Sequence, residues 1–219
     1  MNALKQGTPA MDAYRKVKKA IAQQALKPGD VLTENQLCKA FDLGRSPVRT
    51  ALKQLSLDGF VELPPNRSAR VSQFSHKQVR QLYSLRSMML SHALELTIDT
   101  YTEKDIAQLT HCLDRQEAAF QEYDFEAYLS AVYDLFFFII HKAGNPYLDE
   151  MATGVLGKIN VFLCLYDNFY TVKKLDTLPL HKKIVKSIAQ KKPNNVMQLH
   201  QELNNRILNA YDYMVLSNL

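Results

Sequence analysis

Arg45 and Arg49 lie one helical turn apart, at the beginning of a segment whose apolar residues recur at helical spacing. Both guanidinium groups are therefore expected at the exposed start of a helix. A guanidinium group donates a planar pair of hydrogen bonds, which matches the acceptor edge of guanine or the oxygens of a phosphate. Helices that present arginine from their N-terminal end are typical of protein contacts to the major groove of DNA.

The residues around Arg49 predict how this helix begins. Ser46 is expected to be the N-cap, because its hydroxyl can accept a hydrogen bond from a free backbone N–H of the first turn. Pro47 would then occupy the first helical position, where a missing N–H costs nothing. The apolar residues at helical spacing would face a core: Val48, Ala51, Leu52 and Leu55.

Two further helices are predicted upstream. The first has apolar residues at helical spacing and ends at a turn over residues 28–30. The second begins at Thr33, which is spaced from Gln36 as in a capping box. A short turn over residues 42–44 connects it to the arginine-bearing helix, and this is the arrangement of a helix-turn-helix unit.

A β-hairpin is predicted downstream. Residues 60–63 alternate between apolar and polar types, and residues 69–72 can form the returning strand. Asn66 and Arg67 lie in the turn between them, where they are suited to phosphate contact or to entry into the minor groove. Residues 1–74 are therefore predicted to form a winged helix-turn-helix DNA-binding domain of three helices and a β-hairpin wing.

The distribution of charge favours the same division. Residues 1–75 contain 12 Lys and Arg against 6 Asp and Glu, whereas the remainder contains 15 against 16. The net charge of +5 therefore comes from the first third of the chain. Basic charge supplies the part of DNA affinity that is independent of sequence, so this asymmetry predicts double-stranded DNA as a partner.

The rest of the chain, residues 75–219, predicts an antiparallel all-α bundle of about six helices, so the fold class is mainly α. Ser75 and Thr102 have the residue types of N-caps for the first two helices. The later helices are expected over residues 125–143, 148–170 and 181–191, and from residue 194 or 195 onward.

Four segments, residues 26–32, 45–52, 59–61 and 65–67, resemble the DNA-binding domain of the GntR family of bacterial transcription regulators. The resemblance implies that Arg45 and Arg49 contact bases or adjacent phosphates. It further implies that Ser46 and the N–H groups near it bind a phosphate, that Arg67 serves the wing, and that Lys53 is a weaker phosphate candidate. Gly44 and Ser68 depart from the family pattern, which commonly has Ser or Thr at the first position and Gly at the second.

The second half resembles the FCD effector domain of the FadR branch of this family, and six helices suit its VanR-like members. The similarity rests on Arg86, residues 143–146, Leu180, His181 and His200. It implies a cytoplasmic homodimer that binds a palindromic operator, more often as a repressor, and that responds to a small-molecule effector.

The resemblance also raises the question of a metal. Many FCD domains bind a divalent metal through an Asp and a His one turn apart on the third helix and through two later His residues. Counting back from Gly144 puts Val132 and Phe136 at the first two positions, and neither can ligate a metal. His181 and His200 match the other two, which is fewer than the three or more protein ligands usual for such metals. No cofactor is therefore predicted, and the family metal is expected to be absent or weak.

Two alternatives stay open for His181 and His200. They can be hydrogen-bonded core residues, as histidines in helical bundles often are, or they can bind an effector. In the second case neutral imidazoles and the charged Arg86 would hold a carboxylate or phosphate, as in an organic acid or acyl compound. The apolar run over residues 135–140 suits either an acyl ligand or the core. If the pocket is filled, the chain would be a constitutive DNA-binding or interaction protein.

Several classes of protein are excluded by composition. No apolar stretch approaches the ~20 residues of a membrane span, and no secretory signal is expected. The three cysteines lack metal or redox spacing, which suits a reducing cytosol. The sequence contains no phosphate loop and no nucleophile elbow, so an enzyme is not predicted.

Overall fold

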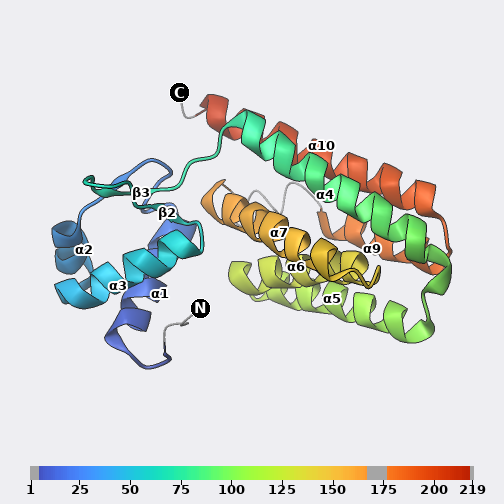
Figure 1. The fold of residues 1–219 in the computed structure, drawn as a ribbon, viewed down its shortest axis with the longest axis horizontal. Helices are drawn as coiled ribbons and strands as arrows, with labels where there is room; N and C mark the ends of the chain where they lie inside the picture. Colours follow the sequence, from blue (N-terminus) through green and yellow to red (C-terminus); the bar gives the residue numbers. More distant parts are fainter. Residues whose placement is uncertain (1–4, 167–176, 218–219) are drawn as a thin grey trace. The chain divides into compact units, whose positions relative to one another are not determined.

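The computed structural model of the chain describes residues 5–166 and 177–217, which are mainly helical (Figure 1). Contacts divide the chain into two compact units. One consists of Met1–Phe74 with Cys164–Tyr166, and the other of Ser75–Leu163 with Asp167–Leu219. Within the described ranges, no helix is both long enough and apolar enough to cross a membrane.

Three helices form the N-terminal unit: α1 (Pro9–Ala22), α2 (Glu34–Phe41) and α3 (Arg45–Leu57). The predicted capping box at the start of α2 is confirmed, because the Thr33 hydroxyl accepts from the Gln36 N–H and the Gln36 side chain accepts from the Thr33 N–H. The cap at Thr33 therefore sets the start of α2 at the next residue, Glu34.

The predicted wing is present as part of a small antiparallel sheet. Strands β2 (Val61–Glu62) and β3 (Ala69–Val71) form the hairpin, and β1 (Val31–Leu32) pairs with the other edge of β3. Strand β1 was not predicted, because the β3 residues with which it pairs, Ala69 and Arg70, lie far along the chain. In the sheet order β1-β3-β2, the segment before α2 pairs with strand β3 of the wing.

The core of this unit is formed mainly between α1 and α3. Val17 and Ile21 of α1 and Val48 and Leu55 of α3 are completely buried. Because the apolar stripe of α3 faces this core, its polar residues are left on the outer surface. The core therefore determines which side of α3 is available to a partner.

The C-terminal unit is all α in the described residues, as predicted. Its helices are α4 (His76–Thr97), α5 (Glu103–Gln121), α6 (Phe125–His141), α7 (Pro146–Tyr166), α9 (Thr177–Ala189) and α10 (Pro193–Ser217), with a short 3₁₀ helix η1 (Ile98–Thr100) after α4. Helix α9 begins four residues before the predicted start at His181. The predicted extension of the fourth helix to Tyr170 lies partly outside the described residues.

Each helix of the bundle contributes a buried stripe to a shared core. Helix α4 contacts α6 and α10, and α5 contacts α6 and α9 (Figure 1). Helices α9 and α10 also contact each other. These contacts bring residues far apart in sequence, on α4, α6, α9 and α10, around one interior region.

Candidate nucleic-acid interface and bundle pocket

Helix α3 begins earlier than predicted, so the assignment of Ser46 as its N-cap is wrong. Gly44 is the N-cap, with an extended backbone (φ −73°, ψ 156°), and Arg45 is the first helical residue. The Val48 N–H closes the first turn on the Gly44 carbonyl at 3.2 Å. Pro47 is tolerated throughout the first turn of a helix, so its presence did not identify the first position.

The start of α3 therefore has no side-chain cap. Gly44 has no side chain to accept from the first N–H groups, which leaves those of Arg45 and Ser46 outside the helical ladder. Arg45, Ser46 and Arg49 are all exposed. Residues 45–49, called the α3 tip below, thus combine two guanidinium groups with the positive end of a helix, a combination that attracts phosphate.

Arg49 is held by a residue that the sequence analysis did not single out. Its Nε and Nη2 donate to the two carboxylate oxygens of Glu34, at 2.7 and 2.9 Å. The hydrogen bonds from Arg49 lower the pKa of the Glu34 carboxyl below its ordinary value, so the pair is ionic near neutral pH. Glu34 is an acidic residue directly after the Thr33 cap of α2. This position at the start of α2 was the sequence signal that could have identified Glu34.

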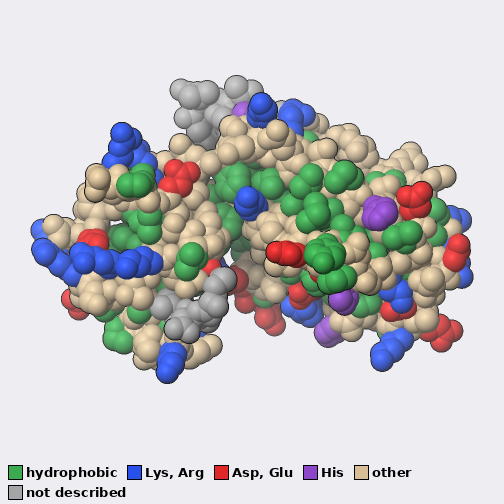
Figure 2. Space-filling model, viewed as in Figure 1, with side chains coloured by type: hydrophobic (Ala, Val, Ile, Leu, Met, Phe, Trp, Pro, Cys, Tyr) green, Lys and Arg blue, Asp and Glu red, His purple; other side chains and the backbone are tan. Residues whose placement is uncertain are grey.

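The wing residues lie on the surface of the same unit. Asn66 adopts the left-handed conformation in the hairpin turn (φ 57°), which asparagine tolerates better than most residues. Ser68, which replaces the usual glycine, does not have to adopt a positive φ. Arg67 and Lys53 are also exposed. Figure 2 shows several Lys and Arg side chains on the visible face of this unit.

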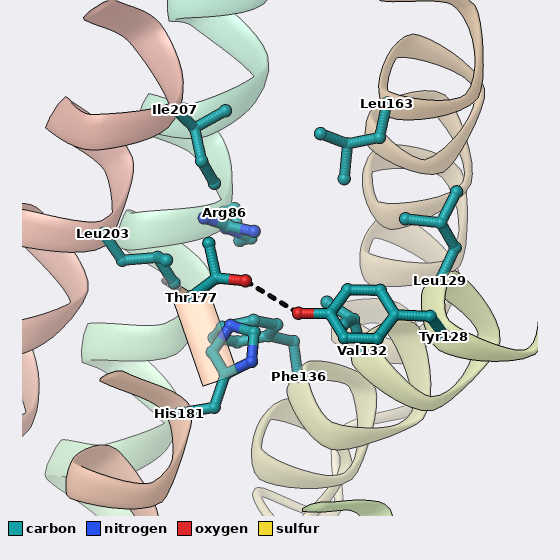
Figure 3. A pocket seen from close by; sticks show the side chains of 10 residues that line it. All are labelled: Arg86, Tyr128, Leu129, Val132, Phe136, Leu163, Thr177, His181, Leu203 and Ile207. Atoms are coloured by element: carbon teal, nitrogen blue, oxygen red, sulfur yellow. Dashed lines mark hydrogen bonds between the residues drawn. The ribbon is translucent and has the colours of Figure 1, made fainter. Parts of the chain in front are cut away.

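The C-terminal unit contains a pocket between its helices (Figure 3). Its volume is about 30 Å³, which is room for about two water molecules. Most of the wall is apolar, and the polar groups are Arg86, His181 and the hydroxyls of Tyr128 and Thr177, which lie 2.7 Å apart. The apolar residues that line it are Leu129, Val132, Phe136, Leu163, Leu203 and Ile207.

Arg86 is the charged residue of this pocket, and only 2% of it is exposed. Its Nη2 donates to the Asn204 side-chain carbonyl, and its guanidinium group lies 4.6 Å from the ring centroids of both Tyr83 and Phe136. Its buried Nε has no hydrogen-bond partner among the residues that the structure describes. Burial lowers the pKa of Arg86 to about 10, so the group still carries its charge at neutral pH.

The structure brings His181 and His200 to the same place. Their rings lie 5.5 and 5.6 Å from the Phe136 ring, which is therefore next to both. The Nδ1 of His181 is 2.7 Å from Gln116 Oε1, and the Nδ1 of His200 is 3.3 Å from Ser87 Oγ.

Both imidazoles are neutral at physiological pH. Burial lowers the pKa of His181 to about 3, and the nearby Arg86 charge acts in the same direction. Burial, Arg86 and His181 together place the pKa of His200 well below its ordinary value. Within this cluster the positive charge is therefore carried by Arg86.

The residues at the position of the family metal do not fit a metal ion. Val132 and Phe136 offer no ligand atoms, and the Phe136 ring lies beside both histidines. The buried Arg86 charge next to this ring would also repel a cation. In the described part of the chain, no group of three or more His, Cys, Asp or Glu side chains could hold a metal ion.

Three neighbours of the predicted effector residues were missed by the sequence analysis. Asn204 accepts from Arg86 and donates to Ser87 Oγ at 2.8 Å, and Gln116 contacts His181. Asn204 is one helical turn after His200, so helical spacing could have indicated it. Nothing in the local sequence could have identified Gln116, because α5 and α9 meet only in the folded bundle.

A winged helix-turn-helix unit joined to an all-α unit with an internal pocket defines a class of two-domain transcription regulators. Comparison with known families agrees with this class. Residues 9–71 match the family of bacterial regulatory proteins called gntR, and residues 81–206 match the FCD domain. The chain therefore belongs to the GntR family, in the FadR-like branch with an FCD C-terminal domain, which is a family of transcription regulators and not of enzymes.

Curated relatives match over part of their length. The Bacillus subtilis regulator YdhC, described as uncharacterized, is 32% identical over 106 residues, which are 48% of this chain and 47% of that protein. The Escherichia coli regulator McbR is 26% identical over 127 residues, 58% of each chain. The E. coli repressor RspR is 28% identical over 108 residues, 49% and 47% of the two chains. The chain thus spans about half the length of the curated relatives it matches.

Solved structures of similar fold match over almost the whole chain. The structure of E. coli McbR has a TM-score of 0.64 at 18% identity and covers 94% of this chain and 98% of that one. A putative GntR regulator from Rhodococcus sp. RHA1 has a TM-score of 0.67 at 18% identity, with 94% and 97% covered. At this identity the likeness establishes the fold alone.

Proposed function

We propose that this protein is a repressor that binds a palindromic operator as a homodimer and changes its DNA affinity when a small organic molecule occupies the bundle. The observation that carries the proposal is the α3 tip, where Arg45, Arg49 and uncapped N–H groups lie on one exposed helix end of a basic unit. Two relatives from E. coli, RspR and GlaR, are named as transcriptional repressors, which supports repression of transcription as the function of this protein.

A stripe of exposed apolar side chains on α4 supports the homodimer. Leu85, Met88 and Leu96 are exposed, and they fall within about 80° of arc at 100° per residue. The opposite side of α4 is buried in the bundle core. A second copy that covered this stripe would form a two-fold interface, and a two-fold protein requires a palindromic DNA site.

The experiment is a selection of bound fragments from a random double-stranded DNA library with the full-length chain. We expect an enriched palindrome, and light scattering of the complex should give two protein chains per DNA duplex. Enrichment of a site without two-fold symmetry, or one chain per duplex, would contradict the dimeric operator complex. A bound site placed over the promoter of a reporter gene would then distinguish repression from activation.

The small size of the pocket favours a second candidate function, constitutive DNA binding without an effector. The Phe136 ring lies beside both histidines, and the remaining volume is about 30 Å³. In this case the operator affinity would not respond to any compound that the bundle binds. A thermal-shift screen of organic acids and acyl compounds, followed by operator binding in the presence of any compound that raises the Tm, separates the two functions.

Arg49→Ala is expected to weaken binding to the selected operator by about 1–3 kcal/mol and to relax the base preference at one position of each half-site. The reason is the loss of the guanidinium N–H groups of Nη1 and Nη2 that Glu34 leaves free, which a base edge can accept. Fluorescence anisotropy with the operator and its single-base variants measures both effects. Arg49→Lys keeps the charge but loses the fork, and Lys104→Ala on α5 removes an exposed charge of the other unit. Equal loss on all DNA sequences would argue against base contact by Arg49.

Arg67→Ala should act differently, because a residue of the wing turn is suited to phosphate contact. We expect a uniform loss of affinity across DNA sequences and a shallower dependence of log K on log salt, by about one unit for each phosphate that the variant no longer neutralises. Titrations at several salt concentrations measure the slope. An unchanged slope would show that Arg67 does not neutralise a phosphate.

A further inference from the structure

We propose that Glu34 is a positioning residue that determines how sharply this protein distinguishes its operator from other DNA. Its carboxylate holds the Arg49 guanidinium group in one orientation and neutralises the charge that Arg49 would otherwise present to phosphates. The inference rests on the proposed function in so far as Arg49 contacts operator DNA. It adds a residue of α2, outside the α3 tip, through which sequence specificity is set.

The first argument is the geometry of the pair. Arg49 Nε and Nη2 donate to the two carboxylate oxygens of Glu34, at 2.7 and 2.9 Å. These bonds use the side of the guanidinium group that carries Nε, and they leave both N–H groups of Nη1 and one of Nη2 for another acceptor. The remaining N–H groups form an outer fork that matches the acceptor edge of guanine. The Arg49 side chain is 63% exposed while the pair is formed, so this fork is open to a ligand.

The second argument is that Glu34 has a fixed place. It is the first residue of α2, directly after Thr33, whose capping box sets the start of the helix. Helices α2 and α3 contact each other, so the start of α2 is held beside the α3 tip. A free arginine side chain loses rotamer freedom when it binds a ligand, and a partner on a neighbouring helix removes part of that freedom beforehand. Arg49 is therefore oriented before DNA arrives.

The third argument is that the pair contributes little to folding. Glu34 is 32% exposed and Arg49 more so, and water screens the charges of such a pair. The contact between α2 and the rest of the unit is already secured by apolar burial, because Leu37 on the inner side of α2 is 3% exposed. A two-bond contact to one of the two arginines of the α3 tip is better explained by recognition than by stability.

The fourth argument is electrostatic. Hydrogen bonds from Arg49 lower the pKa of the Glu34 carboxyl, and the Arg45 charge acts in the same direction, so Glu34 is ionised near neutral pH. Arg49 and Glu34 together then carry no net charge. Such a pair gains little from the phosphate charge that every DNA sequence presents, but it keeps the outer fork for a correct base. Glu34 therefore lowers the affinity for DNA in general more than the affinity for the operator.

The test compares the wild type with Glu34→Gln, which has a side chain of the same size and no charge. Fluorescence anisotropy measures binding to the selected operator, its single-base variants and a scrambled duplex of equal length, at several salt concentrations. On the scrambled duplex we expect tighter binding and a slope of log K against log salt that is steeper by about 0.9 for each phosphate that a released Arg49 neutralises. The ratio of operator to scrambled affinity should fall about tenfold, within the range that one bidentate base contact provides.

Two further variants separate orientation from charge. Glu34→Asp keeps the charge at the start of α2 but has a shorter reach, so it should relax the base preference while the salt slope stays close to that of the wild type. It also covers the case in which Glu34→Gln fails to fold. Glu34→Gln added to Arg49→Ala should relax the base preference no further than Arg49→Ala alone, because Glu34 acts through Arg49.

Asp12→Asn is the matched control. It removes an exposed carboxylate of the same unit that is also ion-paired, at 3.0 Å from Lys16 Nζ on α1, and it changes the net charge by the same amount. We expect it to leave both the affinity ratio and the salt slope unchanged.

Three outcomes would overturn the proposal: an unchanged ratio of operator to scrambled affinity in Glu34→Gln, a further loss of base preference when Glu34→Gln is added to Arg49→Ala, or an effect of Asp12→Asn as large as that of Glu34→Gln. In each of these cases the wild type still selects an operator, so the regulator function stands and only the role of Glu34 fails. A wild type that selects no operator would contradict the proposed function and the role of Glu34 together.

Discussion

The double substitution Val132→Asp and Phe136→His is expected to give the bundle a stoichiometric transition-metal ion. The Phe136 ring lies 5.5 and 5.6 Å from the rings of His181 and His200, so an imidazole at this position would face both. A carboxylate at position 132, one turn earlier on α6, would add a fourth ligand. Three or four N and O ligands suit Zn²⁺ or Ni²⁺.

Native mass spectrometry and elemental analysis after dialysis against Zn²⁺ measure the metal content. The control adds His181→Gln and His200→Gln to the double variant, which removes the two histidines that lie beside position 136. This control should bind no metal. Addition of Arg86→Met to the metal-binding variant should tighten the site, because it removes a neighbouring positive charge. An empty double variant that is correctly folded would mean that position 136 does not point between the histidines.

The second large effect is a loss of stability on mild acidification. A base whose pKa is lowered in the folded state binds fewer protons there than in the unfolded chain. For His181 this difference extends from its ordinary value of 6.5 down to about 3, so the stability is complete above pH 6.5 and falls as the pH decreases through that interval. His200 acts in the same direction. Each histidine contributes a slope of up to about 1.4 kcal/mol per pH unit.

Between pH 7 and pH 5 His181 alone should therefore lower the free energy of unfolding by roughly 2 kcal/mol, and His200 should add to this loss. Urea unfolding at several pH values in this window measures the effect, and most carboxyl groups do not yet titrate there. His181→Gln should make the pH dependence shallower even if it changes the absolute stability. His111→Gln on the exposed side of α5 should not. A pH dependence that is the same in all three proteins would contradict the burial of neutral histidines.

Much of the architecture was predictable because it is encoded locally. The capping box at Thr33, the N-cap at Ser75 and the apolar periodicity of the helices depend on residues three or four apart, and they are present as expected. The start of α3 was misplaced because two residue types, Ser46 and Pro47, are both compatible with more than one position of a first turn. Strand β1 escaped prediction because its pairing with β3 involves residues about 40 positions apart.

The bundle pocket was predictable only in part. Arg86, His181 and His200 were singled out from a resemblance, and the structure brings these three residues together. The contacts that determine their chemistry come from other helices: Asn204 for Arg86, Gln116 for His181 and Ser87 for His200. Such contacts are set by helix packing over sequence separations of 65 to 118 residues, which no local pattern records.

The glycine cap of α3 has a consequence for the balance between the stability of the free protein and its affinity for DNA. A Ser in place of Gly44 would gain about a few tenths of a kcal/mol in the free protein, and the backbone there would accept it without strain. On the proposed role of the α3 tip, an operator phosphate supplies the missing acceptor. The recognition helix is then completed by its own binding partner, and a mutation that improved the unbound protein at this residue would compete with the nucleic acid for the same two amides.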